Sequence, residues 1–183
     1  MEKIKLIFGI GNPLKEYQFS YHNLGMLFLD FLKEKLAKEK KWKKSKHFDY
    51  LKLNDLILAK SKVMMNNSGT ALKEILKKFK LKSNEVLVVQ DDSDIYFNSF
   101  KIVFFRSSAG HKGIESIFKN INSKKIWRLR IGARPISLKG KPHQKAETFI
   151  LKKISQEEIK KLPSNFEKIF LTLKNNNLNL KEY

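Results

Sequence analysis

The chain contains no cysteine. This excludes a disulfide framework, a thiol nucleophile and every zinc or iron–sulfur site that needs cysteine ligands, and it fits a reducing compartment. No apolar run reaches the length of a transmembrane helix. The short apolar run near the N-terminus ends in Gly11-Asn12-Pro13 rather than in a small-residue cleavage pattern. We therefore expect a cytoplasmic protein with neither a signal peptide nor a membrane span.

Acidic residues are scarce compared with basic ones. The chain has 38 Lys and Arg against 18 Asp and Glu, which gives a formal net charge of +20. A field of this sign attracts a polyanion and speeds its encounter with the protein. Nucleic acid is the first candidate partner and an anionic membrane surface the second. A compositional bias toward lysine and asparagine accounts for part of the excess.

Several familiar catalytic signatures are also missing. The sequence has no GxxxxGK[ST] phosphate loop, no HExxH zinc motif and no GxSxG nucleophile elbow. The Gly9-x-Gly11 pair is typical of dinucleotide-binding turns, but Leu14 stands where the third glycine would fall. A hydrolase without a thiol or an activated serine must activate water directly, and a His–Asp pair does this at neutral pH.

Apolar runs and helical stripes alternate along the chain. The runs predict strands over residues 4–10, 48–53, 56–60, 86–90, 100–105 and 127–133. Helices are predicted to begin at Asn23, near Asn67 or Ser68, and after the segment 110–113. A C-terminal helix in two parts is predicted to break near Pro163. This alternation predicts an α/β fold, a single domain over residues 1–183 with a mixed, mostly parallel central sheet flanked by helices. The tail after about residue 174 is expected to fray.

Polar residues collect where the predicted strands end. Ligands of such folds bind at the carboxyl edge of the sheet, and Asn12, His22 and Asp91 fall at or near that edge. A carboxylate on one ring nitrogen of a histidine makes the other nitrogen a better base. Asp91 could orient His22 in this way, or residues 91–94 (DDSD) could hold Mg²⁺ or form a plain polar loop. His22 could equally be an ordinary helix-entry residue. The amides available to hold a substrate carbonyl and a water are Asn12, Asn23, Asn66 and Asn67.

Taken together, the motifs resemble one family over nearly the whole chain, the bacterial-type peptidyl-tRNA hydrolases. The matching pieces, in order, are Gly9-Ile10-Gly11-Asn12-Pro13, Tyr17, His22-Asn23-Leu24-Gly25, Met65-Asn66-Asn67-Ser68-Gly69, Gln90-Asp91-Asp92-Ser93-Asp94, Gly110-His111-Lys112-Gly113, Arg128-Leu129-Arg130-Ile131-Gly132 and Phe149-Ile150-Leu151. The resemblance implies a metal-independent, cofactor-free and usually monomeric esterase. Such an enzyme releases the peptide from the 3′ ribose of peptidyl-tRNA and so recycles the tRNA.

The resemblance also implies roles for particular residues. His22 matches the base that activates water, Asp91 matches its orienting carboxylate, and Asn12 and Asn66 match the amides that place the substrate. The residues expected to bind the substrate or the acceptor end of the tRNA are Tyr17, Asn23, Met65, Lys101, His111, Lys112 and Arg130. No metal ligand is implied.

The chain departs from the family pattern at several positions. The family's GNPG, TRHN and GHNG motifs carry Leu14, Tyr21 and Lys112 here, so an arginine beside the histidine and an asparagine near the scissile ester are replaced. The other departures are Val63, Met64, Arg106 and Ser107. The resemblance also implies a clamp for the 5′-phosphate of the tRNA, made by a strand lysine and by the arginine that Arg130 matches. The lysine position falls on Val103 here, and we expect Lys101, on the same strand face, to substitute for it. Two alternatives stay open: a binding protein that has lost catalysis, and a Mg²⁺-dependent nuclease built on residues 91–94.

Overall fold

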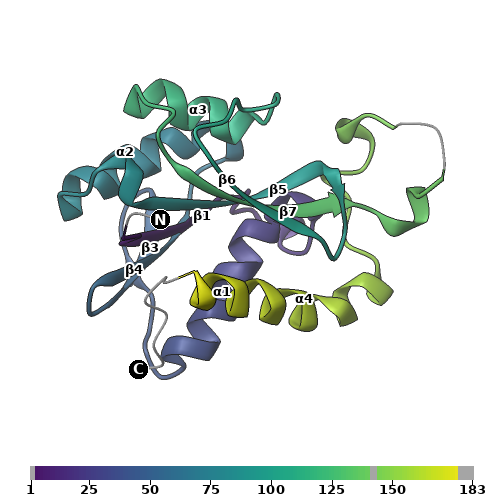
Figure 1. Ribbon diagram of the computed structural model, residues 1–183, viewed down its shortest axis with the longest axis horizontal. Coiled ribbons are helices and arrows are strands. Elements are labelled where there is room, and N and C mark those ends of the chain that lie inside the picture. Colours follow the sequence, from purple (N-terminus) through teal and green to yellow (C-terminus); the bar gives the residue numbers. More distant parts are fainter. Residues whose placement is uncertain (1–2, 141–143, 177–183) are drawn as a thin grey trace.

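A seven-stranded sheet forms the centre of the computed structural model, with helices on both of its faces (Figure 1). The structure describes residues 3–140 and 144–176. The strands are β1 (Leu6–Gly9), β2 (Lys43–Lys44), β3 (Phe48–Leu53), β4 (Leu56–Ser61), β5 (Val86–Tyr96), β6 (Phe100–Phe104) and β7 (Trp127–Arg134). Their order across the sheet is β2-β3-β4-β1-β5-β7-β6.

Parallel strands make up the centre of the sheet and antiparallel strands make up its edges. β1 pairs in parallel with β4 and β5, and β5 pairs in parallel with β7. The β3–β4 hairpin turns at Asn54, which has a positive φ of 45°, while β6 runs antiparallel to β7. The predicted hairpin and the mixed α/β sheet are therefore confirmed.

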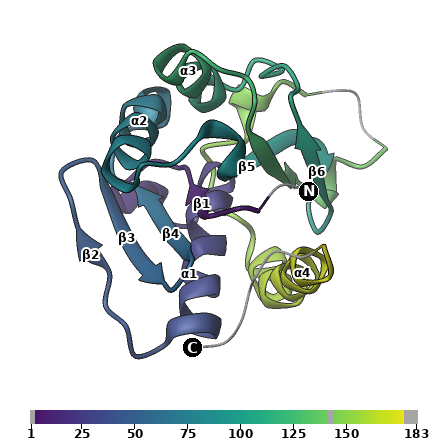
Figure 2. The same ribbon diagram turned by 60° about the vertical axis from the view of Figure 1, so that its left-hand side comes forward.

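Two helices cover each face of the sheet (Figure 2). The helices α1 (Leu24–Ala37) and α4 (Gln156–Asn175) lie on one face, and α2 (Ser68–Phe79) and α3 (Lys112–Ile121) lie on the other. Alternate residues of each strand point to opposite faces, so Leu87 and Val89 of β5 join the core with α1 and α4, while Val88 joins the core with α2 and α3. Both faces of β1 and β5 are buried, which explains their nearly continuous apolar sequence.

Short 3₁₀ turns connect these elements. They are η1 (Lys15–Tyr17), η2 (Tyr21–Asn23), η3 (Met65–Asn67), η4 (Ser83–Glu85), η5 (Ile136–Leu138) and η6 (Ala146–Thr148). η2 leads directly into α1 and η3 into α2. Asn23 and Asn67 stand at the expected starts of these helices, but neither side chain makes a capping hydrogen bond.

The prediction for the fourth buried strand was wrong in length. The strand was expected to end at Gln90, but β5 continues to Tyr96 and remains paired with β7 through a bulge after Asp92. Gly132 permits this pairing, because a Cβ there would lie 2.0 Å from the carbonyl oxygen of Tyr96. The polar residues 91–94 hid the strand because this part of β5 lines a cleft and so lacks the apolar sequence of a strand buried in the core.

The C-terminal helix also differs from the prediction, because α4 is continuous through Pro163. A proline inside a helix removes a hydrogen bond and costs about 3 kcal/mol. The apolar stripe of α4 runs past the proline, however, with Leu162 on one side and Phe166 and Ile169 on the other, all buried. Packing of this stripe outweighs the local cost. The tail was expected to fray after about residue 174. Asn175 still belongs to α4, and residues 177–183 lie outside the described part of the chain.

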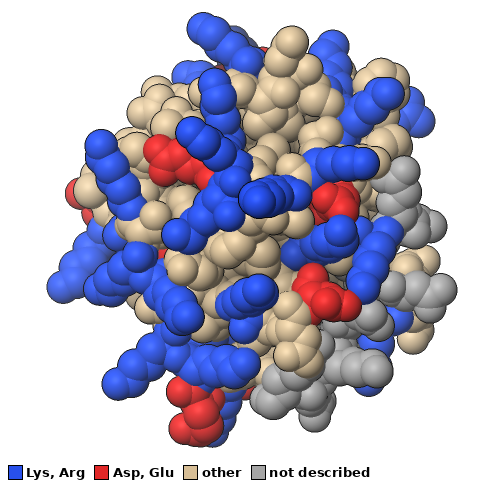
Figure 3. Space-filling view, turned by 90° about the vertical axis from the view of Figure 1, so that its left-hand side faces the viewer, with Lys and Arg blue, Asp and Glu red and all other residues tan. Residues whose placement is uncertain are grey.

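Lysine and arginine side chains dominate the surface that Figure 3 shows, the side of the molecule with α2 and the β3–β4 hairpin. Acidic side chains are few on this face and scattered among the basic ones. On this face the excess of basic residues, part of the formal net charge of +20, is exposed to solvent and can attract a polyanion. In the described part of the chain, no helix is both long and apolar enough to cross a membrane.

Candidate active site

A cleft of about 550 Å³ opens at the carboxyl ends of the central parallel strands. Asn12 follows β1, Asp91 belongs to β5 and Arg130 belongs to β7, and all three side chains line the cleft. His22 from η2 and His111 from the start of α3 complete its polar wall. Residues from five separate parts of the chain thus converge where an α/β sheet binds its ligands.

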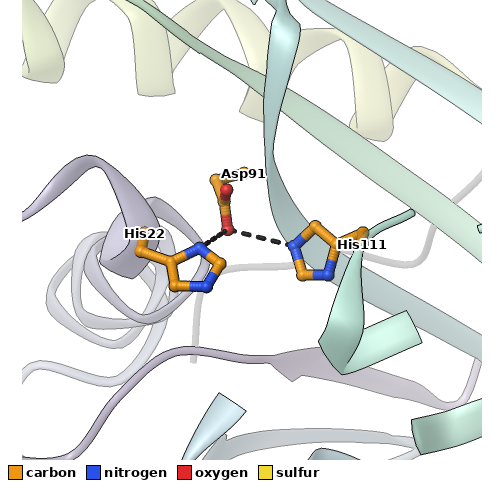
Figure 4. Close-up of side chains that lie close together, drawn as sticks. All are labelled: His22, Asp91 and His111. Atoms are coloured by element: carbon orange, nitrogen blue, oxygen red, sulfur yellow. Dashed lines mark hydrogen bonds and ion pairs between the residues drawn. The ribbon is translucent and has the colours of Figure 1, made fainter. Parts of the chain in front are cut away.

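His22, Asp91 and His111 form a hydrogen-bonded group in this cleft (Figure 4). His22 Nδ1 lies 2.9 Å from Asp91 Oδ1, and His111 Nε2 lies 3.2 Å from the same oxygen. The two imidazole rings are tilted by 42° with their centroids 5.5 Å apart. Asp91 is only 2% exposed, so a single buried carboxylate oxygen orients both rings.

The hydrogen bonds define which ring nitrogens carry protons. His111 Nδ1 accepts a hydrogen bond from the main-chain N–H of Gly113 at 3.2 Å, so the proton of a neutral His111 is on Nε2, which donates to Asp91. The carboxylate also accepts from His22 Nδ1, and this leaves His22 Nε2 without a proton in the neutral ring. A histidine in that tautomer can take a proton at Nε2.

The electrostatics of the group favour ionised Asp91 and a basic His22. Burial acts to raise the pKa of Asp91, but the two histidines outweigh it and hold that pKa well below its usual range. Burial acts to lower the pKa of His22, and the charge and hydrogen bond of Asp91 more than offset this, so the pKa of His22 is raised above its usual value. The ammonium of Lys112 opposes the rise. His22 is therefore a stronger base than a free imidazole.

Asn12 is fixed by two neighbouring segments. Its main-chain N–H donates to Asn23 Oδ1 at 2.7 Å, and its carbonyl accepts from Asn23 Nδ2 at 2.9 Å. Its side-chain Oδ1 accepts from the main-chain N–H of Met65 at 2.9 Å. The close approach requires glycine at position 11, because a Cβ there would lie 2.7 Å from Asn23 Oδ1. The Asn12 amide nitrogen is therefore held at the cleft with its donors available.

The remaining predicted site residues fall into two groups. Asn66, Met65 and Lys112 line the cleft together with those already described. The residues that do not line it are Tyr17, Asn23 and Lys101. Asn23 is buried and its amide is used on Asn12, while Lys101 is exposed on β6. The structure thus brings most of the expected residues together in the cleft, and the other three are not among the residues that line it.

The acidic residues 91–94 do not form an open cation site. Asp91 bonds the two histidines, Asp92 Oδ2 is paired with Nε of Arg130, and Asp94 Oδ1 lies 4.0 Å from Nη2 of Arg134. Each carboxylate already has a basic partner, and a Mg²⁺ ion would have to displace it. The donor set therefore does not favour the magnesium alternative.

Two features of the site were missed by sequence reasoning. Arg128 is buried, and it donates to the main-chain oxygen of Ser107 at 2.8 Å, which ties down the loop before His111. Burial and the nearby Arg130 lower the pKa of Arg128 to about 10. Tyr21 is also buried and bonds Glu158 of α4. In the sequence, Ser155-x-x-Glu158 is a capping-box pattern at the start of a helix, and nothing local links Glu158 to Tyr21.

Known proteins share both the sequence and the fold. Residues 6–178 match the family model described as peptidyl-tRNA hydrolase. The chain is 36% identical to the peptidyl-tRNA hydrolase of Aquifex aeolicus over 162 residues, covering 86% of this chain and 81% of that protein. It is 31% identical to that of Mycoplasma mycoides over 166 residues, covering 89% and 87%. The crystal structure of the enzyme from Acinetobacter baumannii superposes with a TM-score of 0.79 at 24% identity, covering 96% of this chain and 91% of that one.

The family match defines the class of this protein as a hydrolase, and the polar cleft at the carboxyl edge of its mixed α/β sheet lies where such a fold binds its ligands. The chain belongs to the peptidyl-tRNA hydrolase family. It is therefore an enzyme of that activity, and peptidyl-tRNA is the substrate that the family implies. The buried histidines on Asp91 are consistent with a His–Asp catalytic arrangement.

Proposed function

We propose that this enzyme hydrolyses the ester bond between the peptide and the 3′ ribose of peptidyl-tRNA, with His22 as general base and Asp91 as its orienting carboxylate. The observation that carries the proposal is the 2.9 Å hydrogen bond from His22 Nδ1 to a buried Asp91 oxygen. It fixes the tautomer that keeps Nε2 free to accept a proton, and His22 lines the cleft.

The proposed reaction proceeds through a tetrahedral intermediate. His22 Nε2 takes a proton from a water molecule while the water oxygen bonds to the ester carbonyl carbon. The amide nitrogens of Asn12 and Asn66 donate to the developing oxyanion. When the intermediate collapses, the carbon–oxygen bond to the ribose breaks and His22 Nε2 returns the proton to the ribose oxygen. Free peptide and tRNA leave, and the imidazole is neutral again.

Asp91 supports both halves of this cycle. The imidazolium that forms after the first proton transfer is stabilised by the carboxylate at Nδ1. His111 keeps the carboxylate in place through its own bond to the same oxygen, and we assign it to the substrate wall of the cleft. Met65 joins it there, and its main-chain N–H holds Asn12. Asn23 acts as a positioning residue, since both groups of its amide hold the main chain of Asn12.

The acceptor end of the tRNA is proposed to bind beside the cleft, across β6 and β7. Lys101 is paired directly with Arg130 in the antiparallel register, and residues opposite each other share a sheet face. The two cations can therefore hold one phosphate together. Lys101 would replace the family's lysine, whose position is occupied by Val103 in this chain. We assign Tyr17 and Lys112 to further contacts with the substrate, Lys112 from the rim of the cleft.

Release of labelled peptide from an N-blocked aminoacyl-tRNA tests this function. We expect the wild type to release peptide equally well with and without EDTA, because no step uses a metal, and we expect His22→Ala to lose release. His47→Ala is the matched control, since His47 also bonds a carboxylate, Glu74, but lies outside the cleft. Loss of activity with EDTA would favour the magnesium alternative. Tight tRNA binding without release would mean that the fold has been kept without the catalysis.

A further inference from the structure

The side chain of Tyr21 reaches away from the cleft although the residue directly precedes His22. Tyr21 is 4% exposed, and its hydroxyl donates to Glu158 Oε2 at 2.5 Å. The ring packs edge-on against Phe97 and Phe149, with centroids 6.2 and 6.4 Å away. Burial and the bond to Glu158 raise the pKa of the tyrosine above its usual value, so the hydroxyl keeps its proton and remains a donor.

Glu158 joins three separate parts of the chain. It is 5% exposed and lies in the first turn of α4, where the helix dipole favours a negative charge. Besides Tyr21, its Oε2 accepts from the Ser155 hydroxyl at 3.0 Å, and its Oε1 accepts from the main-chain N–H of Ile136 at 3.1 Å. A carboxylate with this many donors is held firmly, and a hydroxyl bonded to it makes a strong, charge-assisted hydrogen bond.

The main chain around His22 is attached to the segment that leads into α4. The His22 N–H donates to the carbonyl of Ile150 at 2.9 Å, and the Tyr21 N–H donates to that of Lys152 at 3.2 Å. The turn that carries His22 is therefore held by main-chain hydrogen bonds from Tyr21 and His22 and by the side-chain bond of Tyr21. Both attachments lead to the same end of α4.

We propose that Tyr21 is a positioning residue for the hydrolysis: its bond to Glu158 fixes the η2 turn so that His22 Nδ1 meets Asp91 Oδ1. The proposal rests on the assignment of His22 as the base. Loss of the hydroxyl leaves the main-chain bonds but frees the turn to shift, and a misplacement of about 1 Å costs up to about 100-fold in rate. Position 21 is also where this chain departs from the family's TRHN motif, in which an arginine precedes the histidine.

The test compares Tyr21→Phe and Glu158→Gln with two matched controls. Tyr50→Phe removes a hydroxyl from a half-buried ring in β3, and Glu167→Gln removes a charge from α4 where it pairs with Lys35. With kcat and KM measured well below the melting temperature of every variant, we expect Tyr21→Phe and Glu158→Gln each to lower kcat about tenfold with little change in KM. The double variant should be little slower than the slower single variant, because both act on the same bond: Tyr21→Phe removes its donor and Glu158→Gln removes the charge of its acceptor.

A second readout separates positioning from general loosening. A weaker His22–Asp91 bond lowers the pKa of His22, so the acidic limb of the kcat/KM profile should move to lower pH in Tyr21→Phe but not in the controls. An unchanged kcat in Tyr21→Phe would overturn the proposal, and so would an equal loss in the controls. If one of the two variants does not fold, the other carries the same comparison. His22→Ala in the same assay shows separately whether the assigned base is correct.

Discussion

Replacing Asp91 by asparagine removes the charge of the carboxylate while keeping its shape. Both histidines bond the same oxygen, Oδ1, so an amide oxygen in that place can accept both hydrogen bonds. The amide orientation is fixed by His111, whose Nε2 carries the proton because its Nδ1 accepts from Gly113. Asp91→Asn therefore isolates the effect of the negative charge on His22, with little change in geometry.

The size of the effect follows from the hydrogen bond that changes. A bond to a charged acceptor contributes about 1.5–3 kcal/mol and one between neutral groups about 0.5–1.5 kcal/mol. The difference of about 1–1.5 kcal/mol corresponds to a loss of roughly tenfold in rate. If the amide instead turned its NH₂ toward His22, the wrong tautomer would cost several thousand-fold, on the order of 10⁴ in comparable triads.

The pH profile gives the sign of the change. His22 acts in its neutral form, so activity rises with pH through the pKa of His22, which Asp91 raises. In Asp91→Asn that pKa falls, and the acidic limb of kcat/KM for peptide release should move to lower pH while the plateau drops about tenfold. Asp30→Asn, at a surface pair with Lys60, is the control. An acidic limb that stays in place or moves to higher pH would refute the reasoning.

Two further predictions concern cations near the site. Lys112 lowers the pKa of His22, so Lys112→Asn should move the acidic limb of kcat/KM to higher pH. If the pH profile, the turnover and the tRNA affinity all stayed unchanged, Lys112 would have no part in the reaction. Lys101→Glu should abolish the preference for a 5′-phosphorylated tRNA. It should also reduce the slope of the logarithm of the binding constant against the logarithm of the salt concentration by about one. Lys73→Glu, an equal charge change on the exposed face of α2, should leave the preference intact, and a retained preference in Lys101→Glu would contradict the clamp.

Local patterns were sufficient to predict most elements of the fold. Continuous apolar runs marked β1 and the first half of β5, because strands buried on both faces have no polar side. Periodicity marked α1 and α3. The patterns failed where tertiary contacts outweighed local preference. The polar residues 91–94 stay in β5 because Asp91 and Asp92 pair with β7 and Tyr96 pairs with it again beyond the bulge. The helix α4 passes through Pro163 because its buried stripe extends beyond the proline.

The chemistry of the candidate site was visible in the sequence to a similar extent. Asp91 was singled out because it follows a predicted strand, and His22 because it precedes a predicted helix near the same edge of the sheet, where ligands bind. The order of the motifs then matched a single family. The sequence marked His111 only as part of a motif, and no spacing rule predicts that it shares one oxygen of Asp91 with His22. Hydrogen bonds between residues 20 to 69 positions apart depend on where the chain folds back.

The sequence by itself therefore determined the fold class, the family and the residue types at the cleft, because periodicity and short motifs are local properties of a chain. The tertiary structure alone decided which partners each side chain meets. It paired every carboxylate of residues 91–94 with a basic group, and it joined Tyr21 to Glu158 across 137 positions. The first contacts depend on how β5 meets β7 and η2, and the second on how α4 packs against the rest of the molecule, and no local pattern records this packing.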